Sequence, residues 1–234
     1  MKNKPVMIIT GTSKGIGSSL VNYYIKEGFQ VVGCSRSDVS FKSQYYKHYL
    51  LDITDEPQVK AMFYEIRKKY QRLDILINNA GVNNTLSPVL LVSLSSALKT
   101  IETNVIGTFL FSREAIKIMK LNSFGRIINF GSMALKHEVE GEAIYTASKA
   151  AVVSFSKILA KEIYGFGITC NVISPSAIET DLMSNIKNDA LVDVLNRNAI
   201  KKIGDVSDII RLIDYLIKPE SKGITGQSVF LGGV

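Results

Sequence analysis

The sequence is poor in several residue types that mark particular classes of protein: its 234 residues include no tryptophan, two histidines, two cysteines and five prolines. Cys34 and Cys170 cannot supply the disulfide framework of a small secreted domain, so a reducing compartment suits them. Neither His48 nor His137 has a partner at metal-ligand spacing. We therefore expect ordinary surface or loop histidines and no metal site.

Long apolar runs are also absent. None approaches the roughly 18–20 residues that span a bilayer. The N-terminal run Val6–Ile9 is shorter than the roughly 7–15-residue apolar core of a secretory signal. These absences predict a cytoplasmic protein with no membrane partner.

The composition that is present is typical of a globular protein, with 46% apolar and 21% charged residues. No repeat or linker divides the chain, so residues 1–234 are expected to form a single domain. The net charge of +7 is concentrated in residues 1–117, which hold 15 basic and 9 acidic side chains. Such an excess is compatible with nucleic-acid binding, but no interleaved aromatics or known binding motif accompany it. We expect a solvated charged surface and no nucleic-acid partner.

Short apolar runs alternate with segments of helical periodicity. Helical spacing follows the first run as far as Gly28 and recurs at Asp52–Tyr70, Leu94–Arg113 and Ala143–Tyr164. Strands that are apolar on both faces are typical of a parallel sheet covered on each side by helices. We predict an α/β fold, a Rossmann-type doubly wound parallel sheet of about seven strands. The runs of strand length are Val6–Ile9, Phe29–Gly33, Ile75–Ile77, Arg126–Asn129, Thr169–Ile173 and Val229–Leu231.

A glycine-rich turn joins the first strand to the first helix. Glycines permit a tight turn and let backbone N–H groups approach a pyrophosphate, while the helix N-terminus favours negative charge. The spacing differs from G-x-G-x-x-G, but the strand before the turn and the helix after it are the context that a dinucleotide site requires. The residues expected to contact the nucleotide here are Gly11, Ser13, Lys14, Gly15, Ile16 and Gly17.

The end of the second strand distinguishes the two nicotinamide dinucleotides. A free ribose 2′-OH requires an acidic side chain there, whereas a 2′-phosphate requires a cation. Ser35 stands where the acid is expected, Arg36 follows it, and Lys14 adds a second cation at the same mouth. Asp38 is the residue that argues the other way. On balance the segment predicts NADP(H) in preference to NAD(H).

Tyr145 and Lys149 are four residues apart, which places them on one face of a helix. Tyr64 and Lys68 share this spacing, but they lie in a charged segment that is typical of a solvated face. Only the first pair follows a strand end that carries a serine, Ser132. An ammonium group beside a phenol lowers its pKa toward neutrality, and a serine hydroxyl can hold a substrate oxygen. This set predicts acid–base chemistry on a small-molecule carbonyl or alcohol, with hydride moved by the cofactor.

In these motifs the chain resembles the short-chain dehydrogenase/reductase family, and most closely its 3-oxoacyl-acyl-carrier-protein reductase branch. The matching landmarks are Thr10-Gly11-x-x-x-Gly15-x-Gly17, Asp52 in LLDITD, Asn78-Asn79-Ala80-Gly81, Asn104 in NVIG, the Ser132, Tyr145 and Lys149 set, SPSAIETDL, and the ending ITGQSVFLGG. The resemblance implies that Ser132, Tyr145, Lys149 and Asn104 are catalytic. It implies further cofactor contacts from Tyr145, Lys149, Ser35, Arg36, Asp52, Ile53, Asn79, Ala80, Gly81, Pro175, Ile178 and Thr180.

The resemblance further implies a homotetramer or homodimer and a substrate lid at about residues 180–203. Two departures from the family pattern are Pro175-Ser176 in place of Pro-Gly and Phe130-Gly131-Ser132 in place of a Ser-Ser ending. The lid segment is polar, so a polar, sugar-like ketone stands as an alternative to a 3-oxoacyl thioester of fatty acid synthesis. A regulatory protein that binds nucleotide without turnover is the alternative from a different class.

Overall fold

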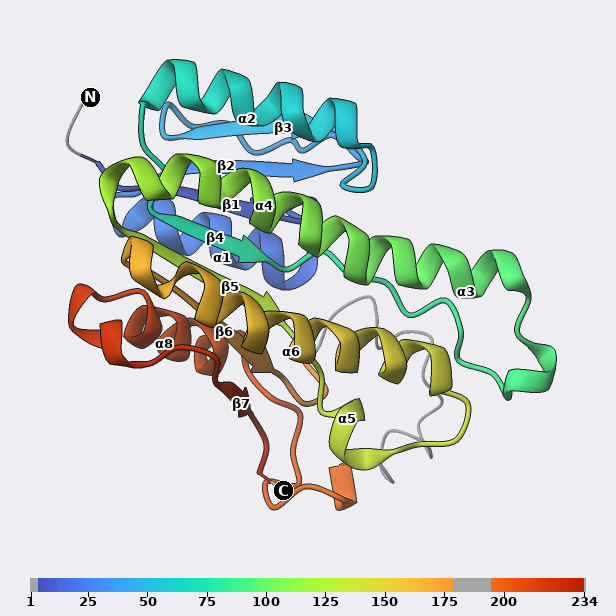
Figure 1. Cartoon of the computed structure of the whole chain (residues 1–234). Coiled ribbons are helices and arrows are strands. Elements are labelled where there is room, and N and C mark those ends of the chain that lie inside the picture. The colour runs from blue at the N-terminus through green and yellow to red at the C-terminus, as the bar shows by residue number, and fades with distance from the viewer. Residues whose placement is uncertain (1–3, 179–194, 234) are drawn as a thin grey trace.

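All seven strands run parallel in one sheet of order β3-β2-β1-β4-β5-β6-β7 (Figure 1). The chain is represented by a computed structural model, which describes residues 4–178 and 195–233. From β1 the chain adds strands first on one side, β2 and β3, and then on the other, β4 to β7. The position between β1 and β4, where this order reverses, is the switch point at which doubly wound sheets bind ligands. The strands are β1 (Val6–Thr10), β2 (Gln30–Ser35), β3 (Tyr46–Leu50), β4 (Ile75–Asn78), β5 (Gly125–Phe130), β6 (Ile168–Ser174) and β7 (Ser228–Phe230).

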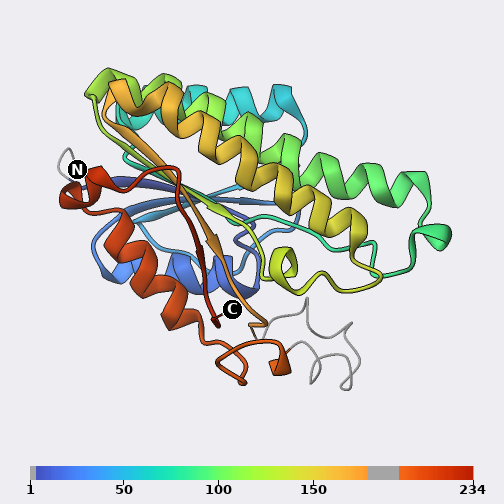
Figure 2. The ribbon, with the colours of Figure 1, turned by 60° about the horizontal axis from the view of Figure 1, so that its bottom comes forward.

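Helices cover both faces of the sheet, which confirms the predicted fold class. Helices α2, α4 and α6 pack on one face and α1 and α8 on the other (Figure 2). β1, β4, β5 and β6 are buried along their whole length, as expected for strands covered on both faces. The helices are α1 (Gly15–Lys26), α2 (Glu56–Tyr70), α3 (Leu94–Ile101), α4 (Gly107–Met119), α5 (Ala134–His137), α6 (Ala143–Ile163) and α8 (Val206–Leu216).

Several elements differ from the sequence expectation, which includes neither α5 nor α8. β3 is not among the expected strands, because its residues YKHYL are half-buried or exposed at the edge of the sheet and form no apolar run. The predicted helix Leu94–Arg113 is instead two helices, α3 and α4, joined by a π-helical turn at Glu102–Ile106. Helical periodicity does not distinguish a π turn from the α-helix around it, and such turns are frequent at functional sites.

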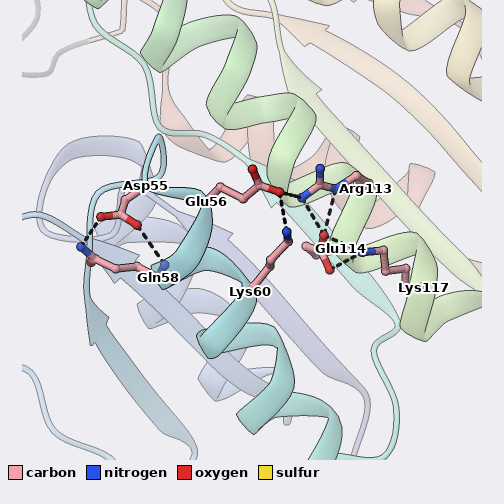
Figure 3. A network of polar contacts seen from close by, with 7 residues as sticks. All are labelled: Asp55, Glu56, Gln58, Lys60, Arg113, Glu114 and Lys117. Carbon is pink, nitrogen blue, oxygen red and sulfur yellow. Dashed lines mark hydrogen bonds and ion pairs between the residues drawn. The ribbon is translucent and has the colours of Figure 1, made fainter.

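An ion-pair network joins α2 to α4, two helices that pack on the same face of the sheet (Figure 3). Arg113 Nη2 lies 2.8 Å from Glu56 Oε1 and 2.9 Å from Glu114 Oε1. Lys60 and Lys117 extend the network at 2.7 Å from Glu56 and 2.8 Å from Glu114. Glu114 is buried, whereas Lys60 and Lys117 are exposed and Glu56 is half-buried. Pairs between exposed side chains contribute little individually, and the two helices also pack through buried apolar contacts.

Within the described residues, no helix is both long and apolar enough to cross a bilayer. Cys34 and Cys170 are buried and unpaired. Burial raises the pKa of each thiol to about 12, as expected of cysteines that serve in packing.

Candidate active site

A cavity of about 600 Å³ opens at the carboxyl ends of the central strands. Most of the predicted site residues line it, from the glycine turn to the loop after β6. Gly17 and Asn104 do not line the cavity, and Thr180 lies outside the described residues. The predicted residues on the wall are Gly11, Ser13, Lys14, Gly15, Ile16, Ser35, Arg36, Asp52, Ile53, Asn79, Ala80, Gly81, Ser132, Tyr145, Lys149, Pro175 and Ile178.

The glycine turn has the shape that a pyrophosphate requires. Gly11 has φ +72°, and a Cβ on Gly17 would lie 2.1 Å from the Gly11 carbonyl oxygen, so neither position accepts a side chain. Helix α1 begins at Gly15, and the N-cap residue, Lys14, makes no side-chain capping hydrogen bond to the first turn. Those N–H groups face a cavity in which an anion would satisfy them, so the residues present fit a dinucleotide phosphate.

Asn79 connects this turn to β4. Its Nδ2 donates to the carbonyl oxygens of Thr10 at 2.9 Å and Gly11 at 3.2 Å. The Ala80 N–H donates to Thr10 Oγ1 at 2.9 Å. Asn79 therefore lines the cavity and also sets the position of the glycine turn.

The end of β2 presents Arg36 to the cavity through an ordered loop. Ser35 Oγ donates to the Ser37 carbonyl at 2.6 Å, and His48 Nε2 donates to the same oxygen at 3.2 Å. Arg36 is exposed and lines the main cavity, whereas Asp38 lines a separate cavity of about 280 Å³ together with Phe41, Lys42 and His48. The acidic residue that argued for NAD(H) is thus absent from the lining of the main cavity.

Ser132, Tyr145 and Lys149 meet at the other end of the same cavity. Ser132 follows β5, and its Oγ accepts a hydrogen bond from the Ala134 N–H at 3.1 Å. Lys149 Nζ donates to the Phe130 carbonyl at 2.9 Å and lies 5.8 Å from the centre of the Tyr145 ring. Tyr64, in the second pair of this spacing, is 69% exposed on α2, as expected for a solvated face.

Burial is the largest influence on the pKa values of Tyr145 and Lys149. It raises the pKa of Tyr145 to about 12, although a hydrogen bond with Ser132 lowers it, and the charge of Glu142 raises it further. Burial lowers the pKa of Lys149 to about 8. The expected lowering of the tyrosine pKa by Lys149 is not found: burial has the largest effect on this pKa, and Lys149 is not among the groups that shift it.

Asn104 lies behind the cavity wall in the π-helical turn and is 1% exposed. Its Oδ1 accepts from the Val82 N–H at 2.8 Å, and its Nδ2 donates to the Val82 carbonyl and to Ser148 Oγ, both at 2.9 Å. Asn104 thereby ties the chain after β4 to α6, one residue before Lys149.

Sequence reasoning missed a polar cluster beyond Ser132. His137 is buried rather than on the surface, and its Nε2 lies 2.8 Å from Asn198 Oδ1. Asn198 Nδ2 in turn donates to Ser176 Oγ at 2.7 Å, which gives a role to the serine that departs from the family pattern. These residues are far apart in sequence and share no periodic signal. In the predicted lid, about residues 180–203, residues 180–194 lie outside the described chain, and Asn198 belongs to the described remainder.

The second departure from the family pattern, Gly131, also has a packing reason. A Cβ at this position would lie 2.3 Å from Ser174 Oγ on the neighbouring strand, so a larger residue would force the Ser174 side chain to move. Across residues 4–178 and 195–233, no group of three or more His, Cys, Asp or Glu side chains is placed to hold a metal ion.

The comparisons with known proteins agree with this geometry. The family model for short chain dehydrogenase matches residues 5–191. The 3-oxoacyl-[acyl-carrier-protein] reductase FabG of Salmonella typhimurium is 30% identical over 97% of this chain and 96% of its own length. The reductase of the same name from Escherichia coli matches with the same identity and coverage.

Solved structures with bound nucleotide share the whole fold. ElxO with NADP bound aligns with a TM-score of 0.89 at 29% identity over 97% of both chains. A 4-hydroxyisoleucine dehydrogenase complexed with NADH aligns with a TM-score of 0.87 at 28% identity over 98% of both chains. Proteins similar to this chain therefore include binders of each of the two dinucleotides.

Proposed function

The chain belongs to the short-chain dehydrogenase family, whose members are oxidoreductases of CH–OH and C=O groups, and from that premise we propose that it is an NADP(H)-dependent carbonyl reductase. One observation carries the proposal: Ser132, Tyr145 and Lys149 line the same cavity as the glycine turn and Arg36. Hydride donor and proton donor can thus act on one substrate carbon and its oxygen. Bound NADPH would supply the hydride.

The residues of the cavity would divide the remaining work. The Ser132 hydroxyl donates a hydrogen bond to the carbonyl oxygen and orients it toward Tyr145. The Tyr145 hydroxyl, protonated at neutral pH because its pKa is about 12, donates the proton as the oxygen gains charge. Lys149 binds the nicotinamide ribose and, from beneath the ring, stabilises the phenolate that remains. Asn104 positions the segment at Val82 and, through Ser148, the part of α6 that carries Lys149.

NADP(H) is proposed over NAD(H) because the nucleotide end of the cavity carries Arg36 and Lys14 and no acidic side chain at the ribose position after β2. A guanidinium binds phosphate through two parallel hydrogen bonds, whereas a carboxylate there would repel it. Gly11, Gly15 and Ile16 would bind the pyrophosphate, Asp52 and Ile53 the adenine, and Pro175, Ile178 and Thr180 the nicotinamide carboxamide.

Two substrate classes are supported. The curated relatives are named as reductases of 3-oxoacyl groups on acyl carrier protein, so acyl thioesters are one class. Short polar ketones are the other, because polar groups from His137, Asn83 and Glu142 line the cavity near Ser132.

Self-association is proposed from the apolar surface around α3. Leu94 is 74% exposed and Leu98 49% exposed on this helix, and the preceding turn exposes Leu90 at 93%. Phe109 and Ile158 continue the apolar surface onto α4 and α6. A patch of this kind is typical of an interface, so we propose a homodimer or homotetramer.

Two buried free thiols favour a reducing compartment, and we propose the cytoplasm.

The test of the function is Tyr145→Phe. The purified wild type should oxidise NADPH with at least one ketone from a panel that includes acyl thioesters and short polar ketones. The variant should lose about 10²–10⁴-fold in kcat/KM, the usual contribution of a general acid, and should still bind NADPH, as measured by cofactor fluorescence. Tyr64→Phe is the matched control, because that exposed tyrosine shares the spacing but lies outside the cavity. Full turnover by Tyr145→Phe, or NADPH binding by the wild type without reduction of any ketone, contradicts the proposal.

A further inference from the structure

We propose that Glu142 determines substrate choice, and that its carboxylate selects ketones bearing an ammonium or hydroxyl group beside the carbonyl over ketones bearing a carboxylate there. The proposal rests on the proposed carbonyl reduction and adds to it the chemistry of the substituent. It concerns the part of the cavity wall formed by Glu142, Asn83 and His137, next to Ser132 and Tyr145.

Glu142 is placed where a substrate must pass or bind. It is the residue immediately before α6, three positions before Tyr145, and its side chain lines the cavity together with Tyr145 and Ser132. Its charge raises the pKa of Tyr145, which shows that the two groups interact. Glu138 and Glu140, in the same stretch, are exposed and do not line the cavity.

The carboxylate is held in place by the segment that follows β4. Asn83 Nδ2 donates to Glu142 Oε1 at 3.1 Å, and the Ser87 N–H donates to the Gly141 carbonyl at 2.9 Å. Gly141 has φ +86°, a left-handed conformation that favours glycine and turns the chain into α6. The position of Glu142 is therefore set by contacts on both sides of the residue.

The polar atoms that still lack a hydrogen-bond partner in this part of the cavity wall are acceptors, among the described residues. Among the described residues, Asn83 is the only hydrogen-bond donor to the Glu142 carboxylate, and the bond engages Oε1 alone. Asn83 Oδ1 is buried and has no partner within the described chain. A half-buried carboxylate with one hydrogen bond gains from a donor and most from a cation. A donor on the substrate would fit Oε2, whereas a substrate carboxylate would meet a like charge.

The neighbouring charges do not cancel this preference. Across residues 4–178 and 195–233, no Lys or Arg forms an ion pair with Glu142. His137 is the one titratable group whose charge lowers the pKa of Glu142, while burial raises it. The imidazole Nε2 of His137 is already bonded to Asn198. Two like charges brought together in the cavity repel each other, so a substrate carboxylate is expected to be selected against by about tenfold or more.

The experiment uses four methyl ketones that differ in one substituent: 2-butanone, hydroxyacetone, aminoacetone and acetoacetate. Values of kcat/KM with NADPH are divided by the value for 2-butanone for each enzyme. In the wild type we expect aminoacetone and hydroxyacetone to exceed acetoacetate by about tenfold or more. In Glu142→Gln, which keeps the acceptor for Asn83 and removes the charge, the ratio of aminoacetone to acetoacetate should fall by about tenfold or more.

Glu140→Gln is the matched control. It removes the same charge two residues earlier in the sequence, at a position that does not line the cavity. It should reproduce the wild-type ratios. Thermal unfolding of each variant confirms that it is folded. Ratios in Glu142→Gln that stay within about twofold of the wild type overturn the role of Glu142 while leaving carbonyl reduction intact. Binding of NADPH without turnover of any ketone by the wild type overturns the proposed function, and this proposal with it.

Discussion

Residue by residue, the main physical conflict in the site is between burial and charge at Tyr145 and Lys149. Removal from water favours the neutral form of both groups, so the tyrosine pKa rises to about 12 and the lysine pKa falls to about 8. A protonated tyrosine is the form that a reductase requires. A lysine with a pKa near 8 is a buried amine whose charge makes folding less favourable at neutral pH.

That cost predicts a pH-dependent stability. The folded-state pKa of Lys149, about 8, is below the ordinary lysine value of 10.5, so folding releases a proton between these two pH values and the free energy of unfolding rises with pH in that window. From pH 7.5 to pH 9.5 the wild type should gain about 2 kcal/mol relative to Lys149→Met. Urea unfolding of the cofactor-free enzyme at both pH values measures this. Lys157→Met, an exposed lysine of the same helix, should show no such change, and an equal pH response in both variants would contradict the prediction.

A second prediction at this scale concerns Arg36. Arg36→Asp replaces a phosphate-binding cation with a group that repels the 2′-phosphate and can bind a free ribose hydroxyl. The ratio of kcat/KM for NADPH to that for NADH should fall by about 100-fold, corresponding to a few kcal/mol of charged hydrogen bonds. Lys42→Asp makes the same charge change outside the main cavity and should leave the ratio near that of the wild type. If both variants shift the ratio equally, the effect is one of net charge and not of a specific contact.

At the scale of the element, the π-helical turn Glu102–Ile106 shows how a local irregularity serves the site. The wider turn separates α3 from α4 and directs Asn104 toward the chain after β4 and toward Ser148. The polar edge strand β3 likewise positions a site residue, at the end of the cavity where the glycine turn and Arg36 lie. It places His48 against the Ser35–Ser37 loop, which presents Arg36.

Asn104→Ala tests the first of these elements. The substitution removes three hydrogen bonds in a buried position and leaves the Val82 N–H and carbonyl without these partners. The free energy of unfolding should fall by about 2–3 kcal/mol, and kcat should fall with it, because the cavity wall beside Lys149 loses its support. Asn122→Ala, at an exposed position after α4, is the control and should change stability by no more than about 0.5 kcal/mol. A stable Asn104→Ala enzyme with normal turnover would contradict the positioning role.

At the scale of the whole molecule, the described residues place the cavity and the exposed apolar surface in different regions. The glycine turn, Tyr145 and Lys149 line the cavity at the strand ends, while α3 extends past the sheet in line with α4 and beside α6 (Figure 1). The described residues leave about half or more of the surface of Leu94 and Leu98 on α3 uncovered. A self-complementary interface formed there would cover them and hold α4 and α6 against a partner. Asn104 lies in the turn just before α4, and Lys149 lies on α6.

Leu94→Glu tests this assembly. A carboxylate at a position that is apolar and 74% exposed in the isolated chain would be buried in the interface without a partner, and should dissociate it. Size-exclusion chromatography with light scattering should give a multiple of 25.8 kDa for the wild type and a smaller mass for the variant. Leu50→Glu, at an exposed position on the edge strand β3, should keep the wild-type mass. A monomeric wild type contradicts the proposal directly.

Features that depend on local chemistry or on periodicity were readable from the sequence. The glycine turn before α1, the apolar central strands and the four-residue spacing of Tyr145 and Lys149 each follow from the conformational needs of a few neighbouring residues. Together they predicted the doubly wound sheet correctly and indicated the strand ends at which a site would lie. β3 escaped notice because an edge strand is half solvated and needs no apolar run.

Contacts between distant segments were decided only by the tertiary structure. Asn83 meets Glu142, His137 meets Asn198, and His48 meets Ser37, in each case across separations that no periodicity encodes. The ionisation of Tyr145 is of the same kind, since a pKa depends on how much water the assembled fold excludes and on which charges it brings near. Local sequence thus determined the fold class and the reacting groups. Packing decided the environment of those groups, because burial and charge proximity are properties of the folded chain and not of any segment.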